Sequence, residues 1–181
     1  MLEVLTVEPD PEGWRSLEGT GLRARVAGTT YDVEGLTYSD ARANMQREGP
    51  EADGRIVDAT TYWQMSWGYT TQPGTAECRS TQVWVTIDVI TTLPRWIDRD
   101  RAISRDAGSR WVSHLRYLRA HEQGHVEIAV DQAGLLEKAL RDLERSDCQG
   151  LSREANRVAE QHRTRLRARQ VDFDRVAGRG R

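Results

Sequence analysis

His121-Glu122-Gln123-Gly124-His125 lies inside a long stretch with helical periodicity, at about residues 109–145. Two histidines four residues apart on a helix project from the same face, one turn apart, so both imidazoles can bind one metal ion. The glutamate that follows the first histidine can take a proton from a water molecule at that ion. This is the HExxH spacing of zinc peptidases. The motif therefore predicts His121 and His125 as zinc ligands and Glu122 as the catalytic general base.

The helix around the motif has one apolar face. This stripe consists of Trp111, Leu115, Leu118, His125, Ala129, Leu136, Leu140 and Leu143. Glu122 fills the gap between Leu118 and His125, and a buried carboxylate that lacks a partner is costly. We therefore expect Glu122 to face a cleft or a positive charge, which a bound dication supplies. The alternative is a solvated helix on which the two histidines recur by chance.

Size and composition fit one ordinary domain. The chain has 181 residues, with 28 acidic and 26 basic side chains. Because the charges nearly balance and the arginines are scattered among acids, we expect no nucleic-acid partner. There is no apolar run of about eighteen residues, so we expect no membrane span. Residues 1–7 are short, contain Glu3 and lead into a Pro-containing acidic segment, so we expect no signal peptide in this chain.

Two cysteines stand far apart in the sequence. Cys78 follows a turn-rich segment at residues 72–75, and Cys148 lies just beyond the long helix. They fit one structural disulfide that joins the loop to the helix end, and two unpaired thiols are the alternative. A disulfide implies an oxidising compartment, and this conflicts with the expected lack of a signal peptide.

Strand patterns precede helix patterns along the chain, which predicts an α+β domain with a small antiparallel sheet packed on the long helix and a C-terminal helix. The expected strands are 22–26, 29–33, 60–69 and 83–89, with the last two forming a hairpin; the expected helices are 37–47, 109–145 and 152–169. Thr37 and Asp40 form a capping box for the first helix. Leu93-Pro94-Arg95-Trp96 is expected to end the sheet.

We expect residues 83–90 to be an edge strand that holds an extended peptide by main-chain hydrogen bonds, with Trp84 and Val85 as substrate-binding residues. Buried aromatic packing is the alternative for Trp84. His114 lies about 10 Å along the helix from His121, too far to share its metal ion, so we expect it at the rim or in the core.

From Tyr31 to about Gly180 the chain resembles a bacterial family of predicted secreted zinc-dependent proteases. The resemblance rests on the segments Tyr31-Asp32-Val33-Glu34-Gly35, Gly49-Pro50, 63–69 and Thr92-Leu93-Pro94-Arg95-Trp96, on the histidine motif and on both cysteines. It implies a zincin-like fold, a secreted or periplasmic location and hydrolysis of peptide bonds. Residues 1–27 lie outside it, so we expect an N-terminal extension at 1–27 and one zincin-like domain at 28–181.

The resemblance also implies a third zinc ligand. The family's C-terminal segment reads Tyr-Asp-x-x-Thr-x-His-Gly, and the corresponding segment here is Phe173-Asp174-Arg175-Val176-Ala177-Gly178-Arg179-Gly180. The aspartate matches, which makes Asp174 the expected ligand, while the tyrosine, threonine and histidine are replaced. The rival ligands are Asp131, Glu154, Glu160 and His162.

The sequence thus predicts a peptidase with one Zn²⁺ per chain that acts on a peptide or protein substrate. The alternative is a zincin-like scaffold that has lost catalysis and binds a protein or peptide partner. The replaced residues in the C-terminal segment favour this alternative.

Overall fold

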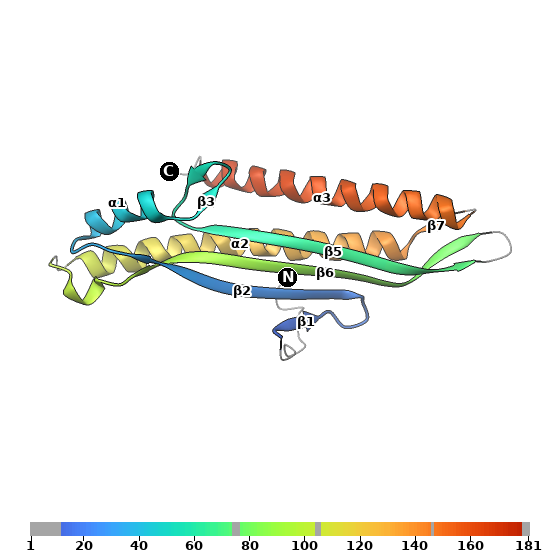
Figure 1. Ribbon diagram of the computed structural model, residues 1–181, viewed down its shortest axis with the longest axis horizontal. Coiled ribbons are helices and arrows are strands. Elements are labelled where there is room, and N and C mark those ends of the chain that lie inside the picture. Colours follow the sequence, from blue (N-terminus) through green and yellow to red (C-terminus); the bar gives the residue numbers. More distant parts are fainter. Residues whose placement is uncertain (1–11, 74–76, 104–105, 146, 179–181) are drawn as a thin grey trace. The chain divides into compact units, whose positions relative to one another are not determined.

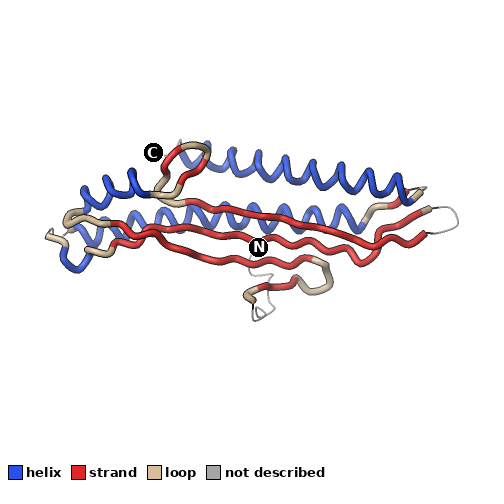
Figure 2. The backbone as a smooth tube through the Cα atoms, viewed as in Figure 1, coloured by secondary structure: helices blue, strands red, loops and turns tan. Residues whose placement is uncertain are grey.

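The computed structural model describes residues 12–73, 77–103, 106–145 and 147–178, and its elements follow the predicted order of strands before long helices (Figures 1 and 2). In chain order they are β1 (Trp14–Ser16), β2 (Leu22–Val33), α1 (Tyr38–Glu48), β3 (Glu51–Ala52), β4 (Arg55–Ile56), β5 (Thr60–Pro73), β6 (Cys78–Trp96), the 3-10 turn η2 (Arg99–Arg101), α2 (Ala107–Arg141), β7 (Glu144–Arg145) and α3 (Cys148–Gly178). The predicted α+β class is confirmed.

The main sheet has the strand order β1-β2-β6-β5, and β7 pairs with one end of β6. The β1–β2 and β6–β7 pairs are antiparallel. β5 and β6 are neighbours joined through residues 74–77, which fits the predicted hairpin. The prediction that residues 83–90 form an edge strand is wrong, because β6 lies between β2 and β5. Among the described strands, β5 is at the edge of the main sheet.

The chain forms two compact units. Unit 1 comprises Met1–Val26, Trp63–Val89 and His125–Arg181, and unit 2 comprises Ala27–Tyr62 and Ile90–Gly124. The long elements β2, β5, β6 and α2 contribute residues to both units. α2 is unbroken from Ala107 to Arg141, as its predicted periodicity requires. In the part of the chain that the structure describes, no helix is long and apolar enough to cross a membrane.

Unit 1 has a core between the sheet and the two long helices. Its buried members are Leu22 and Ala24 of β2, Val85, Ile87 and Val89 of β6, Val126, Ala129, Ala133, Leu136 and Leu140 of α2, Leu143, and Leu151, Ala155, Ala159 and Leu166 of α3. The regular alternation of β6 places Val85, Ile87 and Val89 on one face. The small residues of α3 allow that helix to pack closely against the core. Unit 1 therefore holds α3 in a defined position.

A disulfide joins Cys78 at the start of β6 to Cys148 at the start of α3. Their Cα atoms are 5.1 Å apart and 70 residues separate them in sequence. The predicted pairing is confirmed. It links the sheet to the beginning of α3, next to the short β6–β7 pair.

Unit 2 is organised around α1 and the first half of α2. The predicted capping box is present, with Thr37 Oγ1 accepting from the Asp40 backbone N–H and the Asp40 side chain accepting from the Thr37 N–H. The core of this unit contains Val33, Ala41, Met45, Ala59, Trp96, Ala107, Trp111 and Leu118. Trp96 packs against Trp111 with ring centroids 5.4 Å apart and donates from Nε1 to the Gly35 carbonyl at 2.8 Å.

Several predicted boundaries need correction. The two strands predicted at 22–26 and 29–33 form one strand, β2, which continues through Gly28. Residues 93–96 form the last part of β6, which ends at Trp96, as expected. α3 begins earlier and ends later than predicted and reaches Gly178, which places Asp174 within a helix. The predictions for the N-terminal residues 1–11 and for residues 179 and 180 of the C-terminal family segment concern residues outside the described ones.

Candidate metal centre

The two motif histidines occupy successive turns of α2. The geometry of a continuous helix places their imidazoles on one face. His121 is partly exposed and stacks on Tyr117 one turn earlier, with ring centroids 6.3 Å apart and an interplanar angle of 15°. His125 is 9% exposed, and its ring packs edge to face with the ring of Phe173 of α3, with ring centroids 5.0 Å apart. Each ring is thus held by an aromatic neighbour.

Gln170 of α3 determines which ring nitrogen of His125 carries a hydrogen. Gln170 Nε2 donates to the His125 backbone carbonyl at 3.1 Å, so its Oε1 is the atom that faces His125 Nδ1. An amide oxygen can only accept, so Nδ1 must carry the hydrogen. In the neutral ring, Nε2 then has a lone pair that is directed away from Gln170. This is the orientation in which histidine commonly binds a metal ion, with its other nitrogen hydrogen-bonded to an oxygen.

His125 Nε2 faces a carboxylate. Asp174 Oδ1 of α3 lies 3.0 Å from this nitrogen. With the hydrogen on Nδ1, both atoms are acceptors, so the contact requires a cation between or beside them, either a proton or a metal ion. One ligand atom from each of His121, His125 and Asp174 lies within 4.8 Å of the others. The structure therefore brings together the three residues expected to bind zinc.

Glu122 is buried, with 4% of its surface exposed. Thr61 of β5 donates its hydroxyl hydrogen to Glu122 Oε2 at 2.8 Å, and Thr61 Oγ1 also lies 3.2 Å from the Thr91 hydroxyl of β6. One carboxylate oxygen is thus oriented by the sheet. Neither Thr61 nor Gln170 was predicted from the sequence, because a single polar residue in a strand or a long helix forms no recognisable spacing.

The rival third ligands are engaged elsewhere. The Asp131 carboxylate pairs with Arg169 at 2.6 Å, since α2 continues past the motif and carries Asp131 to another face. Glu154 pairs with Arg157 and Arg145, and the hydrogen bond from Arg157, despite opposing desolvation, lowers its pKa to about 2.

The two remaining rivals also have partners on the helices. Glu160 pairs with Arg163 at 3.4 Å. His162 is buried and its Nδ1 lies 2.7 Å from Gln132 Nε2, which donates to it. Burial lowers the pKa of His162, because desolvation disfavours the charged ring. His162 is therefore a neutral core histidine in this structure.

The residues expected to bind substrate lie on opposite faces of the sheet. Val85 is 0% exposed and belongs to the core of unit 1, so it cannot contact a substrate side chain. Trp84 is 45% exposed and its ring covers Gly68, where an added Cβ would come within 2.5 Å of the indole. The assignment of Val85 is therefore wrong, since the alternation of β6 turns it inward.

A family model described as "Bacterial protein of unknown function (DUF922)" matches residues 29–180, which include the motif, Asp174 and both cysteines. No curated protein matches the chain, and no solved structure matches it. The match does not extend to residues 22–28, although these residues form the first part of β2.

Proposed function

The chain belongs to the bacterial family DUF922, whose function is unknown, and from the geometry of its histidine cluster we propose that it is a zinc-dependent peptidase with a zincin-like site. One observation carries this proposal: one ligand atom from each of His121, His125 and Asp174 lies within 4.8 Å of the others, and the neighbouring Glu122 is buried. A metal ion can bind all three ligand atoms at once.

The donor set fits zinc. Two imidazole nitrogens and one carboxylate oxygen make three protein ligands, the number usual in catalytic zinc sites, which keep a position open for water or substrate. The Gln170 amide oxygen supplies the outer hydrogen bond that such a histidine needs. His121, His125 and Asp174 would hold the ion. When bound, zinc supplies a Lewis acid that makes water more acidic and polarises a carbonyl group.

Glu122 is the general base of the proposed reaction. Thr61 holds its Oε2, so the carboxylate keeps one orientation beside the histidines. Glu122 accepts a proton from the water molecule that attacks the peptide carbonyl carbon. It then transfers this proton to the amide nitrogen as the carbon–nitrogen bond breaks, which yields a carboxylic acid and an amine. Burial of Glu122 limits competition from bulk water for that proton.

β5 is the strand that we assign to substrate binding in place of β6. It is at the edge of the described main sheet, and its residue Thr61 contacts Glu122. The main-chain groups of an edge strand can pair with an extended peptide. A peptide added to β5 would therefore pass the proposed catalytic base.

A non-catalytic scaffold is the second candidate function. It is supported by Phe173 and Ala177, which stand where the resembling family has tyrosine and threonine, so two polar groups are missing beside the proposed ligand. Both candidates allow zinc binding, and hydrolysis separates them. For either, the Cys78–Cys148 disulfide supports a secreted or periplasmic location.

Removal of zinc is expected to abolish hydrolysis. The wild-type protein is incubated with a mixture of denatured proteins, and new N-termini are identified by mass spectrometry before chelation, after chelation and after zinc is restored. Cleavage should disappear on chelation and return with zinc. Cleavage that persists without metal would contradict a metallopeptidase, and absence of cleavage in all three states would favour the scaffold.

Gln170→Leu should weaken zinc binding about 10- to 100-fold, since the variant cannot accept the hydrogen of His125 Nδ1. Affinity is measured by competition with a zinc-binding dye. Gln161→Leu, at an exposed position on α3, is the matched control and should bind zinc as the wild type does. Equal zinc affinity in both variants would show that Gln170 does not orient His125.

A further inference from the structure

A second set of polar side chains lies on the same face of α2 as His121. Arg110, His114, Tyr117 and His121 follow one another at steps of four, three and four residues, and such steps keep residues on one side of a helix. The proposed zinc site uses only the last of them. The first two line a pocket about 10–16 Å along the helix from His121.

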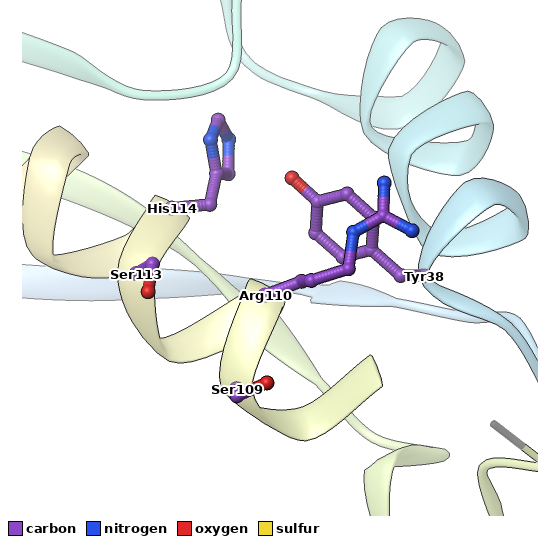
Figure 3. A pocket seen from close by; sticks show the side chains of 5 residues that line it. All are labelled: Tyr38, Ser109, Arg110, Ser113 and His114. Carbon is purple, nitrogen blue, oxygen red and sulfur yellow. The ribbon is translucent and has the colours of Figure 1, made fainter. Parts of the chain in front are cut away.

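The pocket is a cavity of about 390 Å³ lined by Tyr38, Ser109, Arg110, Ser113 and His114. Figure 3 shows Arg110 lying over the Tyr38 ring, with the Tyr38 hydroxyl on the side of His114. Tyr38 and Ser113 have hydroxyl hydrogens to donate, and Arg110 adds donors and a positive charge, while Ser109 donates its hydroxyl hydrogen to the Asp106 carbonyl at 2.8 Å. The described residues that line the cavity include no carboxylate; Asp58 lies behind it, 3.3 Å from His114 Nε2, and Asp106 lies 3.9 Å from Arg110 Nη1. An acceptor group with a negative charge therefore fits the pocket best.

Arg110 is held in place but keeps donors for a ligand. Its guanidinium carbon lies 4.4 Å from the Tyr38 ring centroid, a stacking contact that leaves the planar N–H groups at the ring edge. Its ion pair with Asp106 measures 3.9 Å, which is longer than a hydrogen bond. The planar group can thus bind a carboxylate through two parallel hydrogen bonds.

His114 is held in place by residues behind the pocket. Its Nε2 lies 2.7 Å from Arg42 Nη1 of α1 and 3.3 Å from Asp58 Oδ2. The ring is thus anchored through Nε2 by the Arg42–Asp58 pair. Arg42 is itself paired with Asp58, which keeps this second arginine away from a ligand.

We propose that this pocket binds a carboxylate of the peptide substrate, which makes the protein selective for peptides with an acidic group some residues from the cleaved bond. The inference rests on the proposed peptidase function. An extended chain advances about 3.3 Å per residue, so a distance of about 10–16 Å corresponds to three to five residues. The carboxylate belongs to an aspartate or glutamate side chain or to the C-terminus of the substrate.

The test measures peptide binding without hydrolysis. The zinc-loaded Glu122→Gln variant is titrated into fluorescein-labelled pools of uncharged decapeptides, and binding is followed by fluorescence anisotropy. One pool carries a single glutamate and a C-terminal amide, and the second carries glutamine at that position. The third carries glutamine and a free C-terminal carboxylate. The measurement is repeated with Arg110→Gln and, as a matched control, with Arg119→Gln, which is exposed on the opposite side of α2.

We expect a carboxylate-bearing pool to bind about tenfold more tightly than the uncharged pool, as hydrogen bonds to a charged group allow. Which of the two pools gains affinity identifies the source of the carboxylate. Arg110→Gln should abolish the preference and Arg119→Gln should keep it. Equal affinity for all pools, no binding of any pool, or a preference that survives Arg110→Gln would overturn the inference. These outcomes can be distinguished from failure of the proposed peptidase function, because in that case the wild-type protein would cleave no peptide bond.

Discussion

Glu122→Gln is expected to lower peptide hydrolysis about a hundred- to ten-thousandfold while zinc binding stays unchanged. Glutamine has nearly the same shape and can still accept the Thr61 hydroxyl hydrogen that Glu122 Oε2 accepts at 2.8 Å. It cannot take a proton from water, so the general base is lost without loss of packing. The measurement is the initial rate of peptide cleavage, with zinc content determined on the same preparation.

A matched control tests whether the effect belongs to this carboxylate. Glu127→Gln changes an exposed glutamate on the same helix and should keep the wild-type rate. If Glu122→Gln retained full hydrolysis, the proposed mechanism would be wrong, whatever the zinc content. If it lost zinc as well as activity, Glu122 would have a role in binding the ion.

Removal of the disulfide should destabilise the protein by about 4 kcal/mol in the chain-entropy model, because the bond closes a loop of 70 residues in the unfolded chain. Both cysteines are replaced by alanine in the double variant Cys78→Ala and Cys148→Ala. Serine would place a polar hydroxyl group at the almost fully buried position of Cys78. Urea unfolding followed by circular dichroism gives the free energy of unfolding.

The oxidised wild type and the same protein treated with reductant are compared alongside the double variant. Reduced wild type should approach the stability of the variant. A double variant as stable as the oxidised wild type would mean that the bond is not formed in solution, and it would remove the physical support for an oxidising compartment.

Local sequence patterns were sufficient to predict the structural features that depend only on residues close together in the chain. The spacing of His121 and His125 predicted one helix face, and α2 is continuous through both. Thr37 and Asp40 predicted the capping box that begins α1. The stripe that includes Trp111 and Leu136 is buried as predicted, except for the half-buried Leu115. Each of these follows from the period of the helix or from hydrogen bonds within one turn.

Features that depend on distant parts of the chain were not predictable in the same way. The alternation of residues 83–89 identified a strand but not its place in the sheet, because pairing partners are set by tertiary contacts. β6 therefore proved to be interior, and the edge is β5. Gln170 lies 45 residues from His125, so no local spacing points to their contact. Asp174 was inferred only from a family resemblance.

The most direct test of the central claim is the zinc content of the purified wild type beside His121→Ala, Asp174→Ala and Asp172→Ala. Asp172 is the matched control, since it is an exposed aspartate on α3 that pairs with Arg175. We expect about one zinc per chain in the wild type and in Asp172→Ala. We expect loss of zinc in His121→Ala and in Asp174→Ala. Zinc retained by Asp174→Ala, or no zinc in the wild type even after zinc is supplied, would contradict the central claim.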